Sequence, residues 1–225
     1  MSFFLTYAAE SEEYLLKPAG YVLLVVLLLL VIAAIRLSGK PLLPTKKMQT
    51  KQLVYCSAAM ALALVTSFIK FASLPFGGSI TLFSMMFICL IGYIYGAGTG
   101  LMTGVAYGIL QFITDPYIFA PLQVLLDYPL AFGALGLAGF FSTKKHGLMI
   151  GYLAGVFGRY VCHVISGYVF FAAYAPEDMN PFLYTLGYNA TYIVPEAIVT
   201  AIVLCLPPVA NAIATVKRQA INGAA

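Results

Sequence analysis

The sequence predicts an all-α fold, a polytopic helical bundle that lies in a membrane. Two observations lead to this: 62% of the 225 residues are hydrophobic and only 9% are charged, and the apolar residues gather in runs of about 20, the length that a helix needs to cross a bilayer. Such helices leave no backbone polar group unpaired in lipid. No soluble domain is left over, and the formal charge of +4 is too small and dispersed to indicate nucleic-acid binding.

Seven apolar segments predict seven transmembrane helices, at residues 15–36, 52–72, 80–95, 97–114, 119–141, 148–173 and 182–207. Short connections, marked by proline, glycine and lysine, make sequential helices antiparallel neighbours. We expect residues 1–48 to hold an extracellular stretch, an extra helix and a basic cytoplasmic linker, and residues 49–225 to form one six-helix membrane domain. A secretory signal is the alternative for the first segment, but the flank before it is acidic.

The basic residues predict the orientation. One side of the seven-helix scheme collects Arg36, Lys40, Lys46, Lys47, Lys51, Lys144, Lys145, Lys217 and Arg218. By the positive-inside rule this side is cytoplasmic, so the N-terminus lies outside, the C-terminus inside, and the loops at 73–79 and 174–181 face outward. The four cysteines lie singly in separate apolar segments, which indicates small buried residues rather than a disulfide or metal site.

Small residues predict close helix packing. A four-residue step returns to one helix face, and glycine follows that step at Gly96, Gly100, Gly104 and Gly108. Packing within the chain is the simpler interpretation of this ridge, and a partner helix is the alternative. Two similar stripes lie on the second helix, Ala59 with Ala63 and Ser57 with Ala61. An exposed stripe of this kind would suit a helical partner.

Ionisable residues inside apolar runs indicate the functional region. There are four: Asp127, Arg159, His163 and Glu196. At the centre of a membrane helix a charged side chain costs about 2.5–3.5 kcal/mol on insertion scales, so it marks a functional site by default. The plainer interpretation is a structural network in which Arg159 pairs with Glu196 or Asp127. We favour that scaffold role for Arg159 and Glu196.

Polar stripes on three helices predict a small-molecule pocket. Spacings of three and four residues place on common faces Gln123 with Asp127, Arg159 with His163, and Asn189 with Tyr192 and Glu196. Aromatic residues surround them, namely Tyr128, Phe171, Tyr184 and Tyr188, and convergent polar groups within aromatic walls are typical of ligand sites. With His163 neutral, the ionisable set carries one negative charge. A flat cation would balance that charge and be attracted by the aromatic faces.

At these residues the chain resembles the thiamine-specific S components of energy-coupling factor (ECF) vitamin transporters, the YuaJ family of thiamine transporters. The resemblance covers residues 50 to 220 and rests on three motifs, LLDYPLAF at 125–132, GRYVCHVISGYVFF at 158–171 and YNATYIVPE at 188–196. It implies a six-helix core, an outward-facing pocket and a first loop that acts as a lid. The segment at 15–36 is then one helix beyond that core.

The resemblance also implies site residues. Thiamine would be bound by Asp127, Tyr128, His163, Phe171, Tyr184 and Asn189, with Gln123, Arg159, Tyr188, Tyr192 and Glu196 as a secondary pocket or scaffold set. The family walls its ligand with tryptophans, and this chain has none. One tryptophan position aligns with Phe171, and the other falls near Gly78.

The partners implied are a transmembrane coupling subunit and two ATPases in the bacterial cytoplasmic membrane, with Ala59 and Ala63 meeting the coupling subunit. No GxxxxGK[ST] phosphate loop occurs, so we expect a transport subunit without its own ATP site, cofactor or metal. A self-sufficient proton-coupled carrier, in which Asp127, His163 or Glu196 titrates, is the alternative, although paired broken helices in two repeated halves are not evident. An intramembrane enzyme is the remote alternative, because no HExxH or GxSxG motif supports it.

Overall fold

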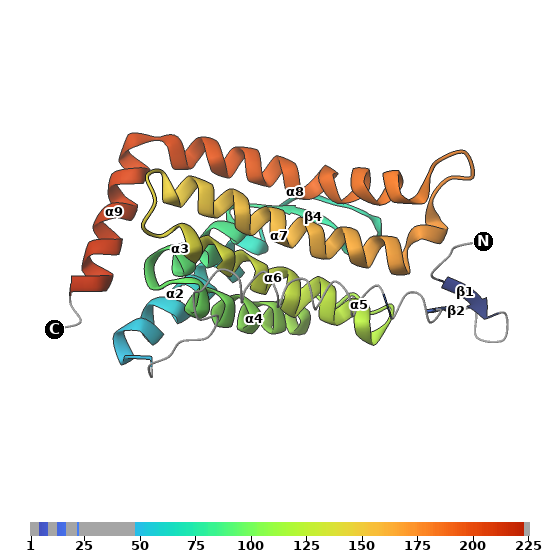
Figure 1. Ribbon diagram of the computed structural model, residues 1–225, viewed down its shortest axis with the longest axis horizontal. Coiled ribbons are helices and arrows are strands. Elements are labelled where there is room, and N and C mark those ends of the chain that lie inside the picture. Colours follow the sequence, from blue (N-terminus) through green and yellow to red (C-terminus); the bar gives the residue numbers. More distant parts are fainter. Residues whose placement is uncertain (1–4, 9–12, 17–21, 23–47, 223–225) are drawn as a thin grey trace.

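The structure, a computed structural model, describes residues 5–8, 13–16, 22 and 48–222 (Figure 1). Its elements are β1 Leu5–Ala8, β2 Glu13–Leu16, α2 Thr50–Ser67, β3 Lys70–Ser73, β4 Ser79–Thr81, α3 Ser84–Tyr95, α4 Ala97–Thr114, α5 Pro121–Leu125, α6 Ala131–Ala134, α7 Gly147–Phe170, α8 Pro181–Cys205 and α9 Pro207–Asn222. A π-helical turn, Leu126–Leu130, joins α5 to α6, and a 3₁₀ segment, Leu135–Phe141, continues α6. The described part is mainly helical, as the composition predicts.

Four of the predicted helices lie within a few residues of their expected ends. These are α4, the composite helix Pro121–Phe141, α7 and α8. The start of α8 follows from its sequence, because the Asn180 side chain accepts hydrogen bonds from the backbone N–H groups of Phe182 and Leu183, at 2.9 and 3.4 Å. Pro181 occupies the first turn, where no N–H is needed.

The predicted boundaries around the first loop are wrong. The helix expected at 52–72 ends at Ser67, and the one expected at 80–95 begins at Ser84. Between them β3 and β4 form an antiparallel hairpin whose turn contains Gly77, with φ of 88°. No proline or glycine precedes Pro75 in this segment, so no helix-breaking residue marked the end of α2.

The expected extra first helix lies mostly outside the described residues. Leu15 and Leu16 belong to β2, which pairs with β1, so the predicted start of that helix is wrong. Apart from Val22, the rest of the segment 15–36 lies outside the described residues. Most of the predicted region 1–48 does so too.

The sequence analysis missed α9. This helix crosses the end of α8 at a steep angle (Figure 1). Polar residues such as Asn211, Lys217 and Arg218 interrupt its apolar residues, so the sequence has no apolar run that predicts this helix. Lys217 anchors it by donating to the Ser142 carbonyl at 2.9 Å and by lying 3.6 Å from the centre of the Tyr93 ring.

The outside of the bundle is apolar. Three helices of the described part are long and apolar enough to cross a membrane, Pro121–Phe141, α7 and α8. Large hydrophobic side chains point away from the bundle along these helices and α2, including Leu62 (50% exposed), Phe157 (66%) and Ile202 (61%). Such exposure would be costly in water, and lipid removes that cost.

The glycine ridge packs inside the chain. A Cβ at Gly104 would lie 2.3 Å from the Phe132 carbonyl oxygen, and one at Gly108 would lie 2.5 Å from that of Tyr128. Gly100 likewise meets Gly92 and Gly136, whereas Gly96 has no atom within 4 Å. The ridge therefore lets α4 touch the backbone of Pro121–Phe141, which carries Asp127.

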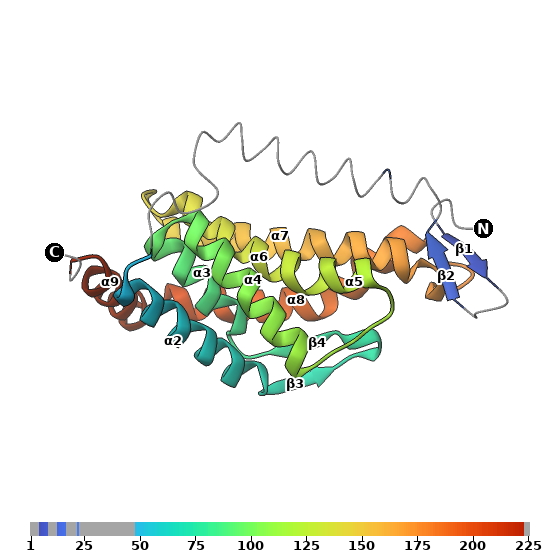
Figure 2. The same cartoon turned by 90° about the horizontal axis from the view of Figure 1, so that it is seen from below.

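The two ends of the bundle differ, as both views show (Figure 2). One end holds α9, the start of α2 and the connection between Phe141 and α7, where Lys51 donates to the Gln219 carbonyl. The described basic residues Lys51, Lys144, Lys145, Lys217 and Arg218 lie in these elements. The β1–β2 hairpin and the connection from α7 to α8 lie at the other end.

Candidate ligand-binding site

A cavity of about 120 Å³ lies between α4, Pro121–Phe141, α7 and α8, with the β3–β4 turn against it. The side chains and backbone that line it come from Gly77, Gly78, Ser79, Gln111, Asp115, Tyr117, Gln123, Asp127, Tyr128, Phe132, Arg159, His163, Ser166, Gly167, Phe171, Tyr184, Thr185, Tyr188, Asn189 and Tyr192. All six residues predicted as ligand contacts are among them. Of the secondary set, only Glu196 is not.

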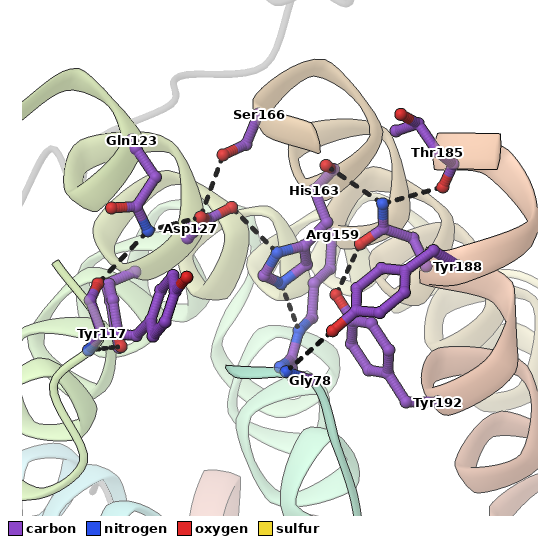
Figure 3. A network of polar contacts seen from close by, with 12 residues as sticks. Gly78, Tyr117, Gln123, Asp127, Arg159, His163, Ser166, Thr185, Tyr188 and Tyr192 are labelled. Carbon is purple, nitrogen blue, oxygen red and sulfur yellow. Dashed lines mark hydrogen bonds and ion pairs between the residues drawn. The ribbon is translucent and has the colours of Figure 1, made fainter. Parts of the chain in front are cut away.

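Asp127 is the polar centre of the cavity wall (Figure 3). Its Oδ2 accepts from Gln123 Nε2 at 2.7 Å and from Ser166 Oγ at 2.9 Å, and its Oδ1 lies 3.0 Å from His163 Nδ1. The residue lies in the π-helical turn, where Pro129 lacks the N–H that a regular helix would use. Such turns are frequent at functional sites because they redirect a side chain.

The predicted ion pair of Arg159 is wrong. Within the described residues Arg159 contacts no carboxylate within 4 Å, and its Nε donates instead to His163 Nε2 at 3.3 Å. Its guanidinium lies 4.2 Å from the centre of the Phe132 ring, a cation–π contact. Because arginine cannot accept a hydrogen bond, His163 Nε2 is an acceptor and Nδ1 carries the proton toward Asp127. The imidazole is therefore neutral in this arrangement.

Glu196 has a structural position away from the cavity. Its Oε2 accepts from Thr81 Oγ1 at 2.7 Å, and its Oε1 accepts from Ser84 Oγ at 3.2 Å and from the Met85 backbone N–H at 3.3 Å. The carboxylate therefore caps the start of α3, where the helix dipole favours a negative charge. The scaffold role fits, but its partner is a helix end and not Arg159.

The predicted polar residue Asn189 is fully hydrogen-bonded within the chain. Its Nδ2 donates to the carbonyls of Thr185 and His163, at 2.9 and 3.3 Å, and its Oδ1 accepts from Tyr192 Oη at 2.6 Å. Asn189 therefore joins the backbone of α7 and α8 at the cavity wall.

Aromatic rings occupy the walls where tryptophan was expected. Phe171 lies in a cluster with Phe119 and Tyr117, whose ring centres are 5.1 and 6.0 Å from its own. Burial raises the pKa of the Tyr117 phenol, so it stays neutral at physiological pH. On the other wall Tyr184 and Tyr188 stack with centres 6.2 Å apart. A Cβ at Gly78 would lie 2.9 Å from Tyr188 Oη and from Tyr192 Cδ1, so no larger side chain fits there.

The charges that line the cavity are two carboxylates, Asp115 and Asp127, and one guanidinium, Arg159. With His163 neutral, the lining carries one formal negative charge. The formal charge expected from the sequence was the same, but it counted Glu196 in place of Asp115. Asp115 also pairs with Lys70 of β3, which fastens the hairpin beside the cavity.

Several lining residues were not predicted from the sequence, among them Gln111, Tyr117 and Thr185. Thr185 precedes Asn189 by one helical turn, so the spacing could have found it. Tyr117 lies in the connection after α4, where no periodicity applies. Gln111 lines the cavity because of the tertiary fold, which also brings its Nε2 within 2.8 Å of Ser67 Oγ on α2.

The predicted partner surface at Ala59 and Ala63 needs correction. These alanines are 8% and 0% exposed, and Ala63 lies under Tyr107, whose hydroxyl donates to its carbonyl at 3.0 Å. The stripe thus packs inside the chain. The other stripe of α2, Ser57 with Ala61, is exposed.

Sequence comparison identifies the family. The family described as Thiamine transporter protein matches residues 53–215. The chain belongs to this family. It is 41% identical over 180 residues to the thiamine transporter ThiT of Bacillus subtilis (strain 168), a match that covers 70% of this chain and 92% of that one. The thiamine transporter ThiT of Lacticaseibacillus paracasei is 31% identical over 126 residues, covering 50% of this chain and 63% of that protein.

A solved structure agrees with this family assignment. ThiT from Listeria monocytogenes superimposes with a TM-score of 0.56 at 25% sequence identity, over 70% of this chain and 94% of that one. The family match runs from α2 into α9, so the whole cavity lies inside the matched region. The resemblance to the thiamine transporter family is confirmed.

Proposed function

We propose that this protein binds thiamine in the cavity and takes it up across the bacterial cytoplasmic membrane as the substrate-specific subunit of an ECF transporter. One observation carries the proposal: a member of the thiamine transporter family encloses a cavity lined by all six expected contact residues. The transport role of this family also favours a non-enzymatic subunit.

The chemistry of the cavity suits thiamine. Thiamine joins a thiazolium cation to a flat aminopyrimidine, and the cavity offers a carboxylate between aromatic walls. Asp127 supplies the carboxylate, and its three hydrogen bonds hold that carboxylate in place before ligand arrives. A group held ready in this way loses little entropy on binding.

Energy for uptake comes from partners in this proposal, a transmembrane coupling subunit and two ATPases. The exposed stripe Ser57 and Ala61 on α2 gives the coupling subunit a face on which helices can pack closely. Apolar residues flank this stripe, so a contact between α2 and the coupling subunit would lie within the bilayer.

The orientation is also a proposal. The end with α9 and the described basic residues faces the cytoplasm, and the end with β1–β2 faces outward, which follows the positive-inside rule. The β3–β4 turn then forms a lid at the mouth of a six-helix core. The C-terminus lies inside and the N-terminus outside.

Calorimetric titration of the purified, detergent-solubilised protein tests the binding part. Thiamine, thiamine monophosphate and the aminopyrimidine half alone are the three probes. We expect saturable binding of thiamine, tighter than that of either other probe. Absence of binding by all three would contradict the proposed function.

A proton-coupled carrier is the second candidate, because His163 and Asp127 form a titratable pair between α7 and the π-helical turn. Proteoliposomes that contain only this chain separate the two candidates. An imposed pH gradient drives thiamine accumulation in a self-sufficient carrier, whereas an ECF subunit alone accumulates none.

A further inference from the structure

Most polar atoms in the cavity wall are already used within the chain. Asn189 has both N–H groups and its oxygen engaged, and both ring nitrogens of His163 are paired. A ligand that bonds to these groups must replace hydrogen bonds within the chain. A free polar atom of the wall offers a further contact without that exchange.

One buried hydroxyl of the wall is free. Among the described residues, four buried side-chain oxygens lack a hydrogen-bond partner: those of Tyr95, Tyr152, Thr185 and Thr200. Only Thr185 belongs to the cavity lining. Its side chain is buried, with 2% of the residue exposed, so bulk water does not satisfy the hydroxyl. An unpaired buried hydroxyl costs free energy that a suitable ligand atom recovers.

The position of Thr185 is fixed by its neighbours. Its carbonyl accepts from Asn189 Nδ2, and its methyl group lies against α7 at Gly167, where an added Cβ would be 2.6 Å from it. Gly167, itself a lining residue, thus admits the threonine between the two helices. The methyl is held against α7, and the hydroxyl is the part of the side chain left without a partner.

We propose that the Thr185 hydroxyl is a specificity contact, which hydrogen-bonds an uncharged polar atom of the bound heteroaromatic cation. Asp127 then compensates the positive charge of the ligand, and the Thr185 hydroxyl hydrogen-bonds a polar atom at the edge of the ligand. The inference rests on the proposed function, since it deepens the description of the same cavity. The Thr185 hydroxyl can donate or accept, so it suits a ring nitrogen, an amine or a hydroxyl of the ligand.

Substitution by valine tests the contact, because valine replaces only the hydroxyl by a methyl of similar shape. We expect T185V to weaken thiamine binding in calorimetry by roughly three- to tenfold, the effect of losing one neutral hydrogen bond. T185S keeps the hydroxyl and should stay within about twofold of the wild-type dissociation constant. Thermal unfolding in detergent shows whether each variant is folded.

The matched control is T200V. Thr200 is also on α8 and is 0% exposed, but it does not line the cavity, and its hydroxyl faces Tyr152. We expect T200V to bind thiamine as the wild type does. If folded T185V binds as tightly as the wild type, or T200V weakens binding equally, the inference is wrong. If the wild type itself binds no thiamine, it is the proposed function that fails.

Discussion

At the residue scale, the cavity is built around a chain of directed hydrogen bonds from Arg159 to His163 to Asp127. The Arg159 Nε–H donates to His163 Nε2, and the Nδ1–H of the same neutral imidazole donates to the Asp127 carboxylate. The guanidinium charge and the carboxylate thus influence each other without direct contact. This arrangement leaves the carboxylate accessible to the cavity, with 16% of its side chain exposed.

Removal of the Asp127 charge should impair binding. In Asp127→Asn the side chain keeps its size and one acceptor oxygen, but it loses the charge. One carboxylate oxygen becomes an NH₂ group, which cannot accept the hydrogen bonds that Gln123 and Ser166 donate. We expect thiamine binding to weaken by roughly 10- to 100-fold, since hydrogen bonds to a charged group contribute about 1.5–3 kcal/mol. Calorimetry measures the change. Asp178→Asn, in the exposed connection before α8, is the control and should bind normally.

Glu196 should matter for stability and not for binding. Glu196→Gln removes the charge from the start of α3 while it keeps the shape of the cap, so the free energy of unfolding should fall by about 1–2 kcal/mol. Thermal unfolding in detergent measures this, with exposed Glu177→Gln as the control. A lower thiamine affinity with unchanged melting would contradict the assignment of Glu196 to the scaffold.

The candidate site could be predicted from the sequence to the extent that helix faces determine it. The spacing of Gln123 and Asp127, or of Arg159 and His163, follows from helix geometry whatever the tertiary fold. Partners on other helices do not follow in that way. Arg159 was expected to pair with a carboxylate, but Phe132 and His163 lie beside it, and the carboxylate of Glu196 accepts hydrogen bonds at the start of α3 instead.

At the element scale, backbone contact between α4 and Pro121–Phe141 positions the Asp127 carboxylate. In Gly104→Ala, the new Cβ would lie 2.3 Å from the Phe132 carbonyl oxygen, so the helices must separate. Overpacking of this kind costs about 1–3 kcal/mol or more, and we expect a matching drop in the free energy of unfolding. Gly187→Ala on α8, with no atom within 4 Å, should be neutral or stabilising. Equal melting of the two variants would contradict this packing argument.

The β3–β4 hairpin is held over the cavity by Tyr188. Its hydroxyl donates to the Pro75 carbonyl and accepts from the Gly78 N–H at 3.4 Å. We expect Tyr188→Phe to speed thiamine dissociation by roughly tenfold or less, because one clasp of the lid is lost while the ring remains. Dissociation of labelled thiamine after dilution into unlabelled ligand measures the rate.

Tyr160→Phe is the control for that measurement. Its hydroxyl donates to the Leu186 carbonyl at 2.9 Å, between α7 and α8 and away from the hairpin. The control should release thiamine at the wild-type rate. Release from Tyr188→Phe at the same rate would mean that the hairpin does not limit dissociation.

The β3–β4 hairpin and α9 are two elements that were not predicted from the sequence, for different reasons. No proline or glycine separates β3 from the end of α2, and its pairing with β4 includes a glycine at positive φ in the turn. α9 is too polar to look like a span, although it packs on the bundle through Ala220, which is 2% exposed, and Lys217. Hydropathy distinguishes segments that lie in the membrane from segments that lie in water, but it does not distinguish a strand from a helix in either environment.

At the scale of the whole molecule, the bundle is apolar outside and polar at one internal site, and its two ends differ in charge. A protein with this distribution can bind its ligand within the bilayer without an energy source of its own. In the proposed function, transport then depends on a surface that a partner can engage. The exposed stripe of α2, Ser57 with Ala61, combines small residues with exposed apolar neighbours.

A bulky residue on that stripe should separate uptake from binding. We expect Ala61→Trp to bind thiamine normally in detergent, because Ala61 faces away from the cavity, but to abolish ATP-dependent uptake in cells, because a partner helix can no longer approach α2. Ile109→Trp on α4, at a side chain 48% exposed, is the control and should support normal uptake. Thiamine uptake assayed in cells that contain the coupling subunit and ATPases measures both. Uptake by Ala61→Trp at the control level would show that α2 does not carry the coupling contact. Uptake in cells without the ATPases would instead favour the proton-coupled carrier, since only that mechanism moves thiamine with this chain alone.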